Sequence, residues 1–313
     1  MSHERRKLLV DTDTASDDAV ALLMALRDPG VEVLAITVVA GNVPLDQAVQ
    51  NALYTVELSG TDVPVYAGCA VPLVQPLHTA QEVHGEDGMG DIGLPIGGRT
   101  PEPGHAVDAL TEEIEAHQPG ELTLVTLGPL TNIGVLLSRH PEYATRLHEI
   151  VIMGGTGDGI GNVTAAAEFN IWVDPEAASI VFGSGARLVM VGWDISRKYA
   201  TFDAAQAEQL RRVGRLGAFA VDIQAVLNQF ALTETHLAGF DLPDPIAMAV
   251  ALDPSVATDV QHRNVVVELH GRHTRGMTVV DHTGYSRRHP NTHVVLEASR
   301  ERFVQLLEDR LRD

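Results

Sequence analysis

Four aspartates lie within eight residues near the start of the chain, directly after the short apolar run 8–10: Asp11, Asp13, Asp17 and Asp18. Anions packed beside a buried strand are costly unless a positive charge neutralises them. A hard divalent cation does this well, and Ca²⁺ binds several carboxylate and carbonyl oxygens at once. Asp17 and Asp18 open a predicted helix on which neighbouring side chains diverge, so one can face a metal and the other a substrate. The alternative is a solvated acidic turn with Ser16 as the helix cap.

Two other metal-binding patterns can be compared with this segment. An EF-hand loop that began at Asp11 would need Asp or Asn at position 15 and Gly at position 16, and the chain has Ala15 and Ser16 there. Phosphatases of the haloacid dehalogenase type also carry Asp-x-Asp after a first strand, and they need a downstream lysine for the phosphoryl group. Lys198 is the candidate lysine, and no clear strand precedes it. The phosphatase therefore stays as the alternative enzyme class.

The elements that must position these acids follow an alternating pattern over the first 200 residues or so. The pattern predicts strands at 8–10, 31–39, 63–66, 121–127, 149–153 and 187–191, and helices at 18–26, 45–58, 105–117, 130–137 and 175–182. Such alternation is typical of an α/β fold with an open, mostly parallel, Rossmann-like sheet and helices on both of its faces. Binding sites in these folds lie beyond the carboxyl ends of the strands, where the four aspartates are found.

The pattern changes after about residue 200. One or two helices are expected over 204–230, a further helix at 244–252, strands at 263–270, 276–281 and 292–296, and a closing helix at 300–311. No linker rich in Pro, Gly or Ser separates the two regions, so we expect a single domain over residues 1–313, with helical and small β additions on the C-terminal side. Segment 75–100 is rich in Gly, Pro, His and acids and predicts a long loop, which in a compact domain is often functional.

Composition excludes several classes of function. The chain has 313 residues, of which 45% are hydrophobic and 20% charged, a composition that is ordinary for a globular protein. Its formal net charge of −20 argues against nucleic acid or anionic membranes as partners. Cys69 is the only cysteine, so an intramolecular disulfide and a thiolate zinc site are excluded. The sequence shows no signal-peptide pattern and no apolar run of membrane-spanning length. We therefore expect a cytoplasmic location.

Further motifs follow in the order of one known family. They are Asp11-x-Asp13-x-x-x-Asp17-Asp18, Ala40-Gly41-Asn42, the segment VPVYAG at 63–68, HGEDGMG at 84–90, LGPLTN at 127–132, Met153-Gly154-Gly155, Asn162, AEFN at 167–170, VDPEAA at 173–178 and Asp244-Pro245. Over residues 8–253 the chain resembles the nucleoside hydrolases, calcium-dependent N-ribohydrolases that include inosine- and uridine-preferring members. The resemblance implies an enzyme that hydrolyses the N-glycosidic bond of a ribonucleoside and releases ribose and a free nucleobase.

The resemblance also implies roles for particular residues. Ca²⁺ would be bound by Asp13, Asp18, Asp244 and the main-chain carbonyl of Leu127. Asp13 would be the general base that takes a proton from the attacking water. The ribose hydroxyls would be held by Asp17, Asn42, Asn162, Glu168 and Asn170, with Met153 packed nearby. Asp11 is expected to hold the loop by hydrogen bonds rather than bind the metal, and Trp172 and Trp193 are expected in the core. A homodimer or homotetramer is implied by the resemblance alone.

The chain departs from the family pattern before the late metal ligand. Many members that cleave pyrimidine nucleosides or inosine have His there, a proposed acid for the departing base, and this chain has Pro243. Proline cannot donate a proton. His84 and His236 are the candidates for that role, and Phe230 and Phe240 could stack on the base. A non-catalytic ribose or nucleoside binder on the same fold remains a further alternative.

Overall fold

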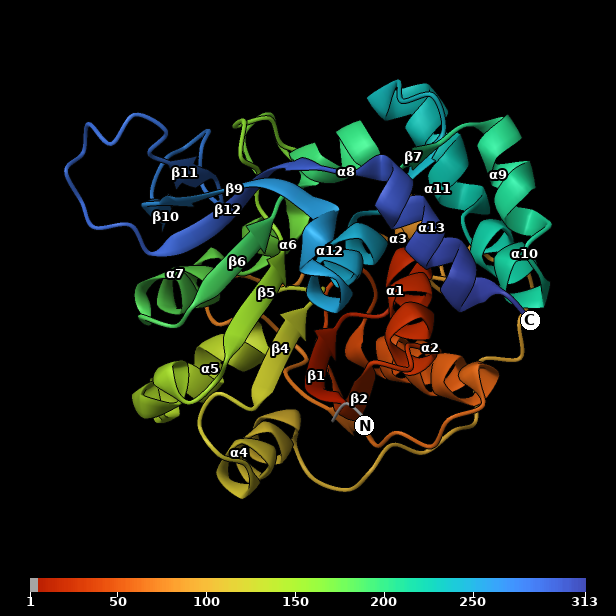
Figure 1. The fold of residues 1–313 in the computed structure, drawn as a ribbon, viewed down its shortest axis with the longest axis horizontal. Coiled ribbons are helices and arrows are strands. Elements are labelled where there is room, and N and C mark those ends of the chain that lie inside the picture. Colours follow the sequence, from red (N-terminus) through yellow and green to blue (C-terminus); the bar gives the residue numbers. More distant parts are fainter. Residues whose placement is uncertain (1–4) are drawn as a thin grey trace.

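The computed structural model describes residues 5–313 and is organised around one large twisted sheet (Figure 1). Its eight strands run in the order β3-β2-β1-β4-β5-β6-β12-β9. All neighbours pair in parallel except β12 and the edge strand β9, which are antiparallel. The strands are β1 (Arg6–Thr12), β2 (Val31–Val38), β3 (Val65–Ala67), β4 (Leu122–Thr126), β5 (Glu149–Met153), β6 (Leu188–Val191), β12 (Thr292–Ala298) and β9 (Ala257–Arg263). The α/β fold with a mostly parallel sheet, which the sequence predicts, is confirmed.

Helices cover both faces of the sheet, and each face has its own apolar core. One face is covered by α1 (Ser16–Leu26), α2 (Leu45–Ser59), α12 (Pro243–Leu252) and α13 (Arg300–Leu311). The other is covered by α4 (Ala106–Ala116), α5 (Thr131–Arg139) and α7 (Pro175–Gly183). Because the central strands are covered on both sides, β1 from Leu8 onward and all of β4 are buried at successive positions and not at alternating ones.

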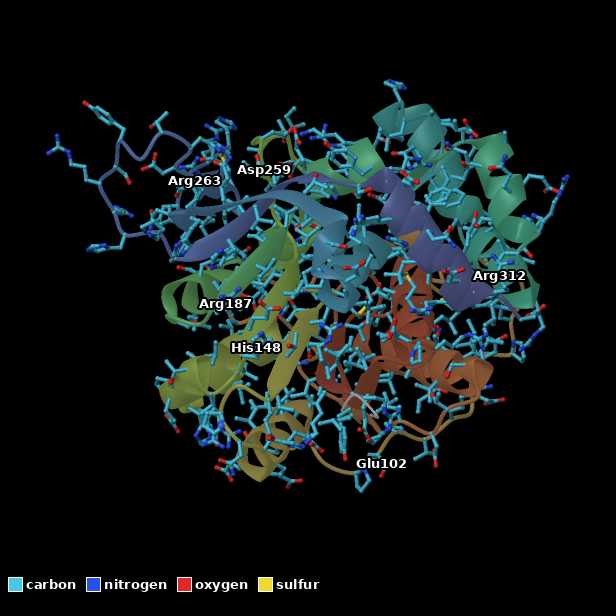
Figure 2. All side chains as sticks on the ribbon, viewed as in Figure 1. Glu102, His148, Arg187, Asp259, Arg263 and Arg312 are labelled. Carbon is cyan, nitrogen blue, oxygen red and sulfur yellow. The ribbon has the colours of Figure 1, made fainter. Side chains whose placement is uncertain are left out.

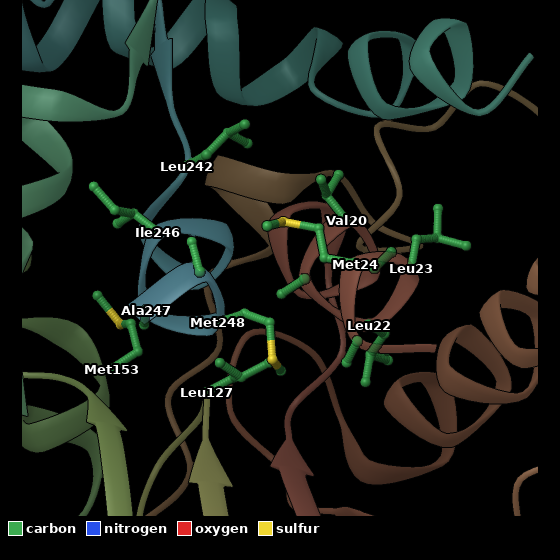
Figure 3. Close-up of a cluster of buried hydrophobic side chains, with 14 of the residues drawn as sticks. Val20, Leu22, Leu23, Met24, Leu127, Met153, Leu242, Ile246, Ala247 and Met248 are labelled. Carbon is green, nitrogen blue, oxygen red and sulfur yellow. The ribbon is translucent and has the colours of Figure 1, made fainter. Parts of the chain in front are cut away.

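Helices α1 and α12 pack side by side over the ends of the central strands (Figure 3). Met24 of α1 points toward α12, Met248 of α12 lies on the side that faces α1, and Met153 at the end of β5 lies below them. All of these side chains are buried. Dense packing of this kind holds the two helix N-termini at one edge of the sheet.

The remaining elements form smaller units around this core. They are α3 (Gln81–His84), the 3-10 turns η1 (Pro141–Thr145) and η3 (Pro254–Val256), α6 (Phe169–Val173), α8 (Trp193–Tyr199), α9 (Ala204–Arg211), α10 (Arg215–Asp222), α11 (Ala225–Phe230) and the π-helical turn η2 (Ala231–Thr235). Two short antiparallel pairs complete the fold: β7 (Thr201–Phe202) with β8 (Phe240–Asp241), and β10 (Val265–Val267) with β11 (Thr278–Val280). Apart from α3, segment 75–100 forms no helix or strand, in agreement with the predicted loop.

Three predictions for the C-terminal part are wrong in detail. The stretch 204–230 forms three helices and not one or two, because α9 ends at Arg211 and α10 ends at Asp222. The strand expected at 263–270 is the shorter β10. The edge strand β9 is missed because its residues alternate between partly buried and exposed positions and are mainly polar.

Charged side chains lie mainly at the periphery, as the exposed residues Glu102, Arg187 and Arg312 illustrate (Figure 2). Within residues 5–313 no single helix has both the length and the hydropathy of a membrane span. Helix α10 and the segment Ala225–Thr235 reach that length and hydropathy only when taken together, and the two are bent by 50° relative to each other.

Candidate active site

The predicted acidic residues meet where β1, β4 and β5 end and where α1 and α12 begin. Asp17 and Asp18 lie in the first turn of α1, and Asp244 lies in the first turn of α12. The three carboxylates offer oxygen atoms that lie within 4.8 Å of one another, and all three are buried. The acidic segment is therefore not a solvated turn. Ser16 is not the helix cap either, since its hydroxyl bonds to His84 and Gln224 inside the protein.

Asp18 is held rigidly at the centre of this cluster. Its Oδ1 accepts a hydrogen bond from Thr12 Oγ1 (2.6 Å), and its Oδ2 accepts one from the backbone N–H of Ala15 (2.9 Å). Asp11 holds the same loop from the other side, as expected, because its Oδ1 accepts from Thr37 Oγ1 (2.5 Å) and Asn132 Nδ2 (2.8 Å). Both aspartates are thus fixed by the strand ends around them.

Asp13 occupies a tight space between two backbone turns. Its Oδ2 accepts a hydrogen bond from the backbone N–H of Asn42 (2.6 Å). A Cβ at Gly41 would lie 2.1 Å from Asp13 Oδ2, and one at Gly128 would lie 2.6 Å from Asp13 Oδ1, so both positions require glycine. Asp13 Oδ1 is buried and has no hydrogen-bond partner within residues 5–313, and the same is true of Asp17 Oδ1.

The cluster is electrostatically unfavourable without a counter-charge. Burial raises the pKa of Asp13, Asp17, Asp18 and Asp244, and repulsion between neighbouring carboxylates raises the pKa values of Asp13, Asp17 and Asp244 further. Burial also raises the pKa of Asp11, to about 7. Oxygen-only donors, unpartnered carboxylate oxygens and crowded negative charge are what a hard divalent cation neutralises, so these residues fit a metal site.

The clustered acids differ in part from the expected metal ligands. Asp18 and Asp244 belong to both sets, but Asp17, expected at the ribose, joins the cluster and Asp13 lies outside it. The carbonyl oxygen of Leu127 lines the same region and accepts a hydrogen bond from Asn170 Nδ2 (2.8 Å).

A cavity of about 540 Å³ opens above the acidic cluster. Nine of the predicted site residues line it: Asp17, Asn42, His84, Leu127, Met153, Asn162, Glu168, Asn170 and Asp244. Asp13 and Asp18 are fully buried beneath it, and His236 is not among the residues that line it. Residues that are far apart in the sequence are thus brought to one cavity that can hold a small molecule.

One end of the cavity is polar. Glu168 caps α6, where its carboxylate accepts hydrogen bonds from the backbone N–H groups of Asn170 (2.9 Å) and Ile171 (3.3 Å) and also from that of Gly155 (2.8 Å). Burial nevertheless raises the pKa of Glu168 to about 7. Asn162 is exposed at the cavity rim, and its Oδ1 accepts from the N–H of Phe169 (2.9 Å). Directed amide and carboxylate groups of this kind suit vicinal hydroxyls.

The other end of the cavity is largely apolar and aromatic. Trp193, Leu227, Phe230 and Pro243 line it, and Asp241 lies among them. Trp172 and Trp193 are both expected in the core, and both line the cavity. Trp193 also packs with the core and is only 8% exposed.

Phe230 and Phe240 were expected to stack on a base, and the structure separates them. Phe230 lines the cavity. Phe240 is buried against Phe202, with ring centroids 5.7 Å apart and rings nearly parallel, and it does not line the cavity. The prediction for Phe240 is therefore wrong.

The two candidate histidines also differ. His84 is buried, its Nδ1 lies 2.9 Å from Ser16 Oγ, and burial lowers its pKa to about 4, so it is neutral at pH 7. His236 is exposed and has a left-handed backbone (φ 56°) directly after η2. Among the described residues, His84 is thus the candidate of the two that reaches the cavity.

Asp241 and Trp193 were not predicted as site residues. No motif points to them, since β8 is two residues long and α8 is short. One feature of the sequence could have pointed to Asp241: it is a carboxylate three positions before Asp244 and therefore lies near the start of α12.

A mostly parallel sheet covered on both faces, with a buried acidic cluster beneath a cavity lined by polar and aromatic side chains, is typical of an α/β enzyme that binds a small molecule. A family model described as inosine-uridine preferring nucleoside hydrolase matches residues 8–305. The chain belongs to this family, and it is a hydrolase of the class that acts on N-glycosyl bonds. The resemblance read from the sequence is thereby confirmed.

Individual relatives cover almost the whole chain. The pyrimidine-specific ribonucleoside hydrolase RihA of Salmonella schwarzengrund is 41% identical over 97% of this chain and 98% of its own length. A plant nucleoside hydrolase, PpNRh1, matches with a TM-score of 0.90 at 32% identity and covers 98% of this chain and 99% of its own. A purine-preferring ribonucleoside hydrolase from Gardnerella vaginalis matches with a TM-score of 0.89 at 34% identity over 98% of each chain.

Proposed function

We propose that the protein is a calcium-dependent ribonucleoside hydrolase that releases ribose and a free nucleobase. The observation that carries this proposal is the buried cluster of Asp17, Asp18 and Asp244, whose oxygens lie within 4.8 Å of one another at the floor of the cavity. Such a donor set favours a hard cation. Two of the named relatives are ribonucleoside hydrolases. A ribonucleoside has a polar sugar and a planar base, which suits a cavity lined by both polar and aromatic side chains.

Asp18, Asp244 and the Leu127 carbonyl would hold the cation, together with Asp13 or Asp17. Bound there, Ca²⁺ would lower the pKa of a water molecule and orient it. Asp13 is suited to act as the general base, because its Oδ1 is free to accept a proton while its Oδ2 is fixed by the N–H of Asn42.

The sugar would be held by side chains on several loops. Asn42, Asn162, Glu168 and Asn170 line the polar end, and Asp17 of the acidic cluster also lines the cavity. Holding the ribose ring in one conformation favours the oxocarbenium-like transition state of glycosidic cleavage. Negative charge nearby stabilises that developing cation.

Departure of the base uses no histidine next to Asp244. Pro243 is the first residue of α12, a position where proline starts a helix favourably, and its side chain has no proton to donate. Burial lowers the pKa of His84 to about 4, so its imidazole is neutral at pH 7 and can form hydrogen bonds in the cavity, but little of the protonated form is present to act as an acid. No step of the proposed mechanism uses His236.

The phosphatase alternative is not favoured. Its lysine would have to reach the acidic cluster, but Lys198 is half-exposed, lies 3.9 Å from Asp194 and does not line the cavity. The single domain over 1–313, the homodimer or homotetramer and the cytoplasmic location stay proposals, and light scattering on the purified protein tests the subunit number.

Release of free ribose from inosine, uridine, adenosine, guanosine and cytidine tests the proposal. The protein is first treated with a chelator and then supplied with Ca²⁺, Mg²⁺ or no metal. Ribose release that is lost with the chelator and restored best by Ca²⁺ is the expected result. Full turnover without metal would refute calcium dependence, and binding without ribose release would favour the non-catalytic binder.

A further inference from the structure

Asp241 is a cavity residue that the mechanism above does not use. It lies on β8, which pairs with β7 through Thr201, and it is 6% exposed while lining the cavity. Of the cavity-lining residues between 193 and 243, all of which the structure describes, Asp241 is the charged one. Its neighbours on that wall include Trp193, Phe230 and Pro243, so a buried acid stands in the aromatic end of the cavity.

Two donors hold the Asp241 carboxylate on one side. Trp193 Nε1 (3.0 Å) and Ser196 Oγ (2.7 Å) both donate to Oδ2, and every side-chain hydrogen bond that Asp241 makes within residues 5–313 is to this oxygen. Trp193 is itself held, since the Arg197 guanidinium lies over its ring at 4.5 Å from the centroid and pairs with Asp158 at 2.7 Å. The carboxylate is therefore preorganised, and its Oδ1 is left for a ligand.

The position of Asp241 points to the base and not to the sugar. The amide and carboxylate side chains of the sugar end come from the loops after β2 and β5 and from α6, whereas Asp241 belongs to the wall formed by α8, α11 and β8. A planar base fits beside Trp193 and Phe230, because aromatic faces stack on nucleobases. A carboxylate oxygen in this wall accepts hydrogen bonds from the exocyclic amino group of a base.

We propose that Asp241 recognises the nucleobase, because its Oδ1 accepts a hydrogen bond from an exocyclic amino group of the base. The enzyme therefore favours amino-bearing bases over their keto counterparts. This inference rests on the proposed ribonucleoside substrate. Cytidine and uridine differ in this way, as do adenosine and inosine. A keto oxygen facing the carboxylate leaves two acceptors opposed without a proton between them, so the penalty is about tenfold or more. The fold and the family do not decide this preference, because the named relatives include pyrimidine-specific and purine-preferring enzymes.

Asp241→Asn provides a sharp test because the orientation of the new amide is determined. Trp193 Nε1 can only donate, so the amide oxygen must take the place of Oδ2 and the amide NH₂ must face the cavity. The acceptor becomes a donor, which suits a keto oxygen. The ratios of kcat/KM for cytidine over uridine and for adenosine over inosine should each fall by about tenfold or more. Each ratio cancels any loss of folded protein or of common chemistry.

The control is Asp194→Asn, a buried aspartate on the same helix as Trp193 that bonds to the N–H of Gly157 and does not line the cavity. It should leave both ratios unchanged. Unchanged ratios in Asp241→Asn would overturn the proposal. An equal loss on all four nucleosides with an altered pH profile would also overturn it, since it would make Asp241 an acid for the leaving group. The proposal would also be overturned if the wild type preferred keto bases and Asp241→Asn abolished that preference.

If the wild-type protein releases no ribose from any of the four nucleosides, the hydrolase proposal fails. Calorimetric binding of cytidine and uridine to the wild-type and Asp241→Asn proteins then decides the inference. The ratio of the two dissociation constants should shift by about tenfold if Asp241 reads the base, and an unshifted ratio would refute it.

Discussion

Glu168→Gln should change how the stability of the protein depends on pH. Glu168 is 2% exposed and accepts backbone hydrogen bonds from Gly155, Asn170 and Ile171, yet burial raises its pKa from 4.5 to about 7. At about 1.4 kcal/mol per pH unit, that rise corresponds to about 3 kcal/mol.

Protonated Glu168 stabilises the folded state at low pH, because the folded state holds the proton more tightly than the unfolded state does. The contribution of Glu168 to stability is full below about pH 4.5 and is lost as pH rises through about 7. Gln cannot ionise, so the variant lacks this dependence. From pH 4 to pH 8, the free energy of unfolding of the wild type should therefore fall by about 3 kcal/mol relative to Glu168→Gln.

Urea unfolding followed by the fluorescence of the two tryptophans measures this difference, with chelator present in every sample so that metal binding does not contribute. Only the change with pH is compared, so any constant cost of the amide at the α6 cap cancels. The exposed-site variant Glu102→Gln controls for the Glu-to-Gln change itself. If the pH dependences of wild type and Glu168→Gln run parallel, the reasoning from burial is wrong.

Three further predictions concern other parts of the molecule. Asp13→Asn should lower kcat by about 10² to 10⁴ with an unchanged circular dichroism spectrum, and an active variant would remove Asp13 as the base. Gly90→Ala should lower the melting temperature well below that of Gly93→Ala, because both glycines have positive φ (+77° and +78°) but only a Cβ at Gly90 meets a backbone atom, the Ile223 carbonyl oxygen at 2.5 Å. Cys69 should react with iodoacetamide at pH 8 about 100-fold more slowly than a peptide thiol, since burial, together with Asp11 and Asp174, raises its pKa to about 11; equal rates would contradict this.

The parts of the fold that sequence predicts well are those in which local pattern and tertiary burial agree. Strand β5 matches its predicted bounds of 149–153, and α13 matches 300–311. The rule that sites follow the carboxyl ends of parallel strands also predicted that Asp17 and Asp18, which follow β1, lie in the site. Asp244 could be added through the family resemblance, because no local pattern links residue 244 to residue 17.

The aromatic end of the cavity was not predictable for a physical reason. Along a strand, successive side chains point to opposite sides, so one of Phe240 and Asp241 must face the cavity and the other the interior. Hydrophobicity does not decide which, because the choice depends on how β8 pairs with β7. The structure directs Phe240 onto Phe202 and leaves Asp241 at the cavity. Similarly, Trp193 belongs to the apolar core and also lines the cavity. A prediction that assigns each tryptophan either to the core or to the ligand misses a residue that does both.

The position of the acidic cluster also couples metal binding to the fold. Helices α1 and α12 direct their N-termini at the cluster, and each helix dipole offers only a partial positive charge, about half a unit. That is too little for Asp17, Asp18 and Asp244 together, and Asp17 Oδ1 remains without a hydrogen-bond partner within residues 5–313. A cation that binds the folded chain and not the unfolded one therefore stabilises it through mass action. Because α1 packs against α12, with Met24 and Met248 between them, the residues that would hold the cation belong to the central core and not to a surface loop.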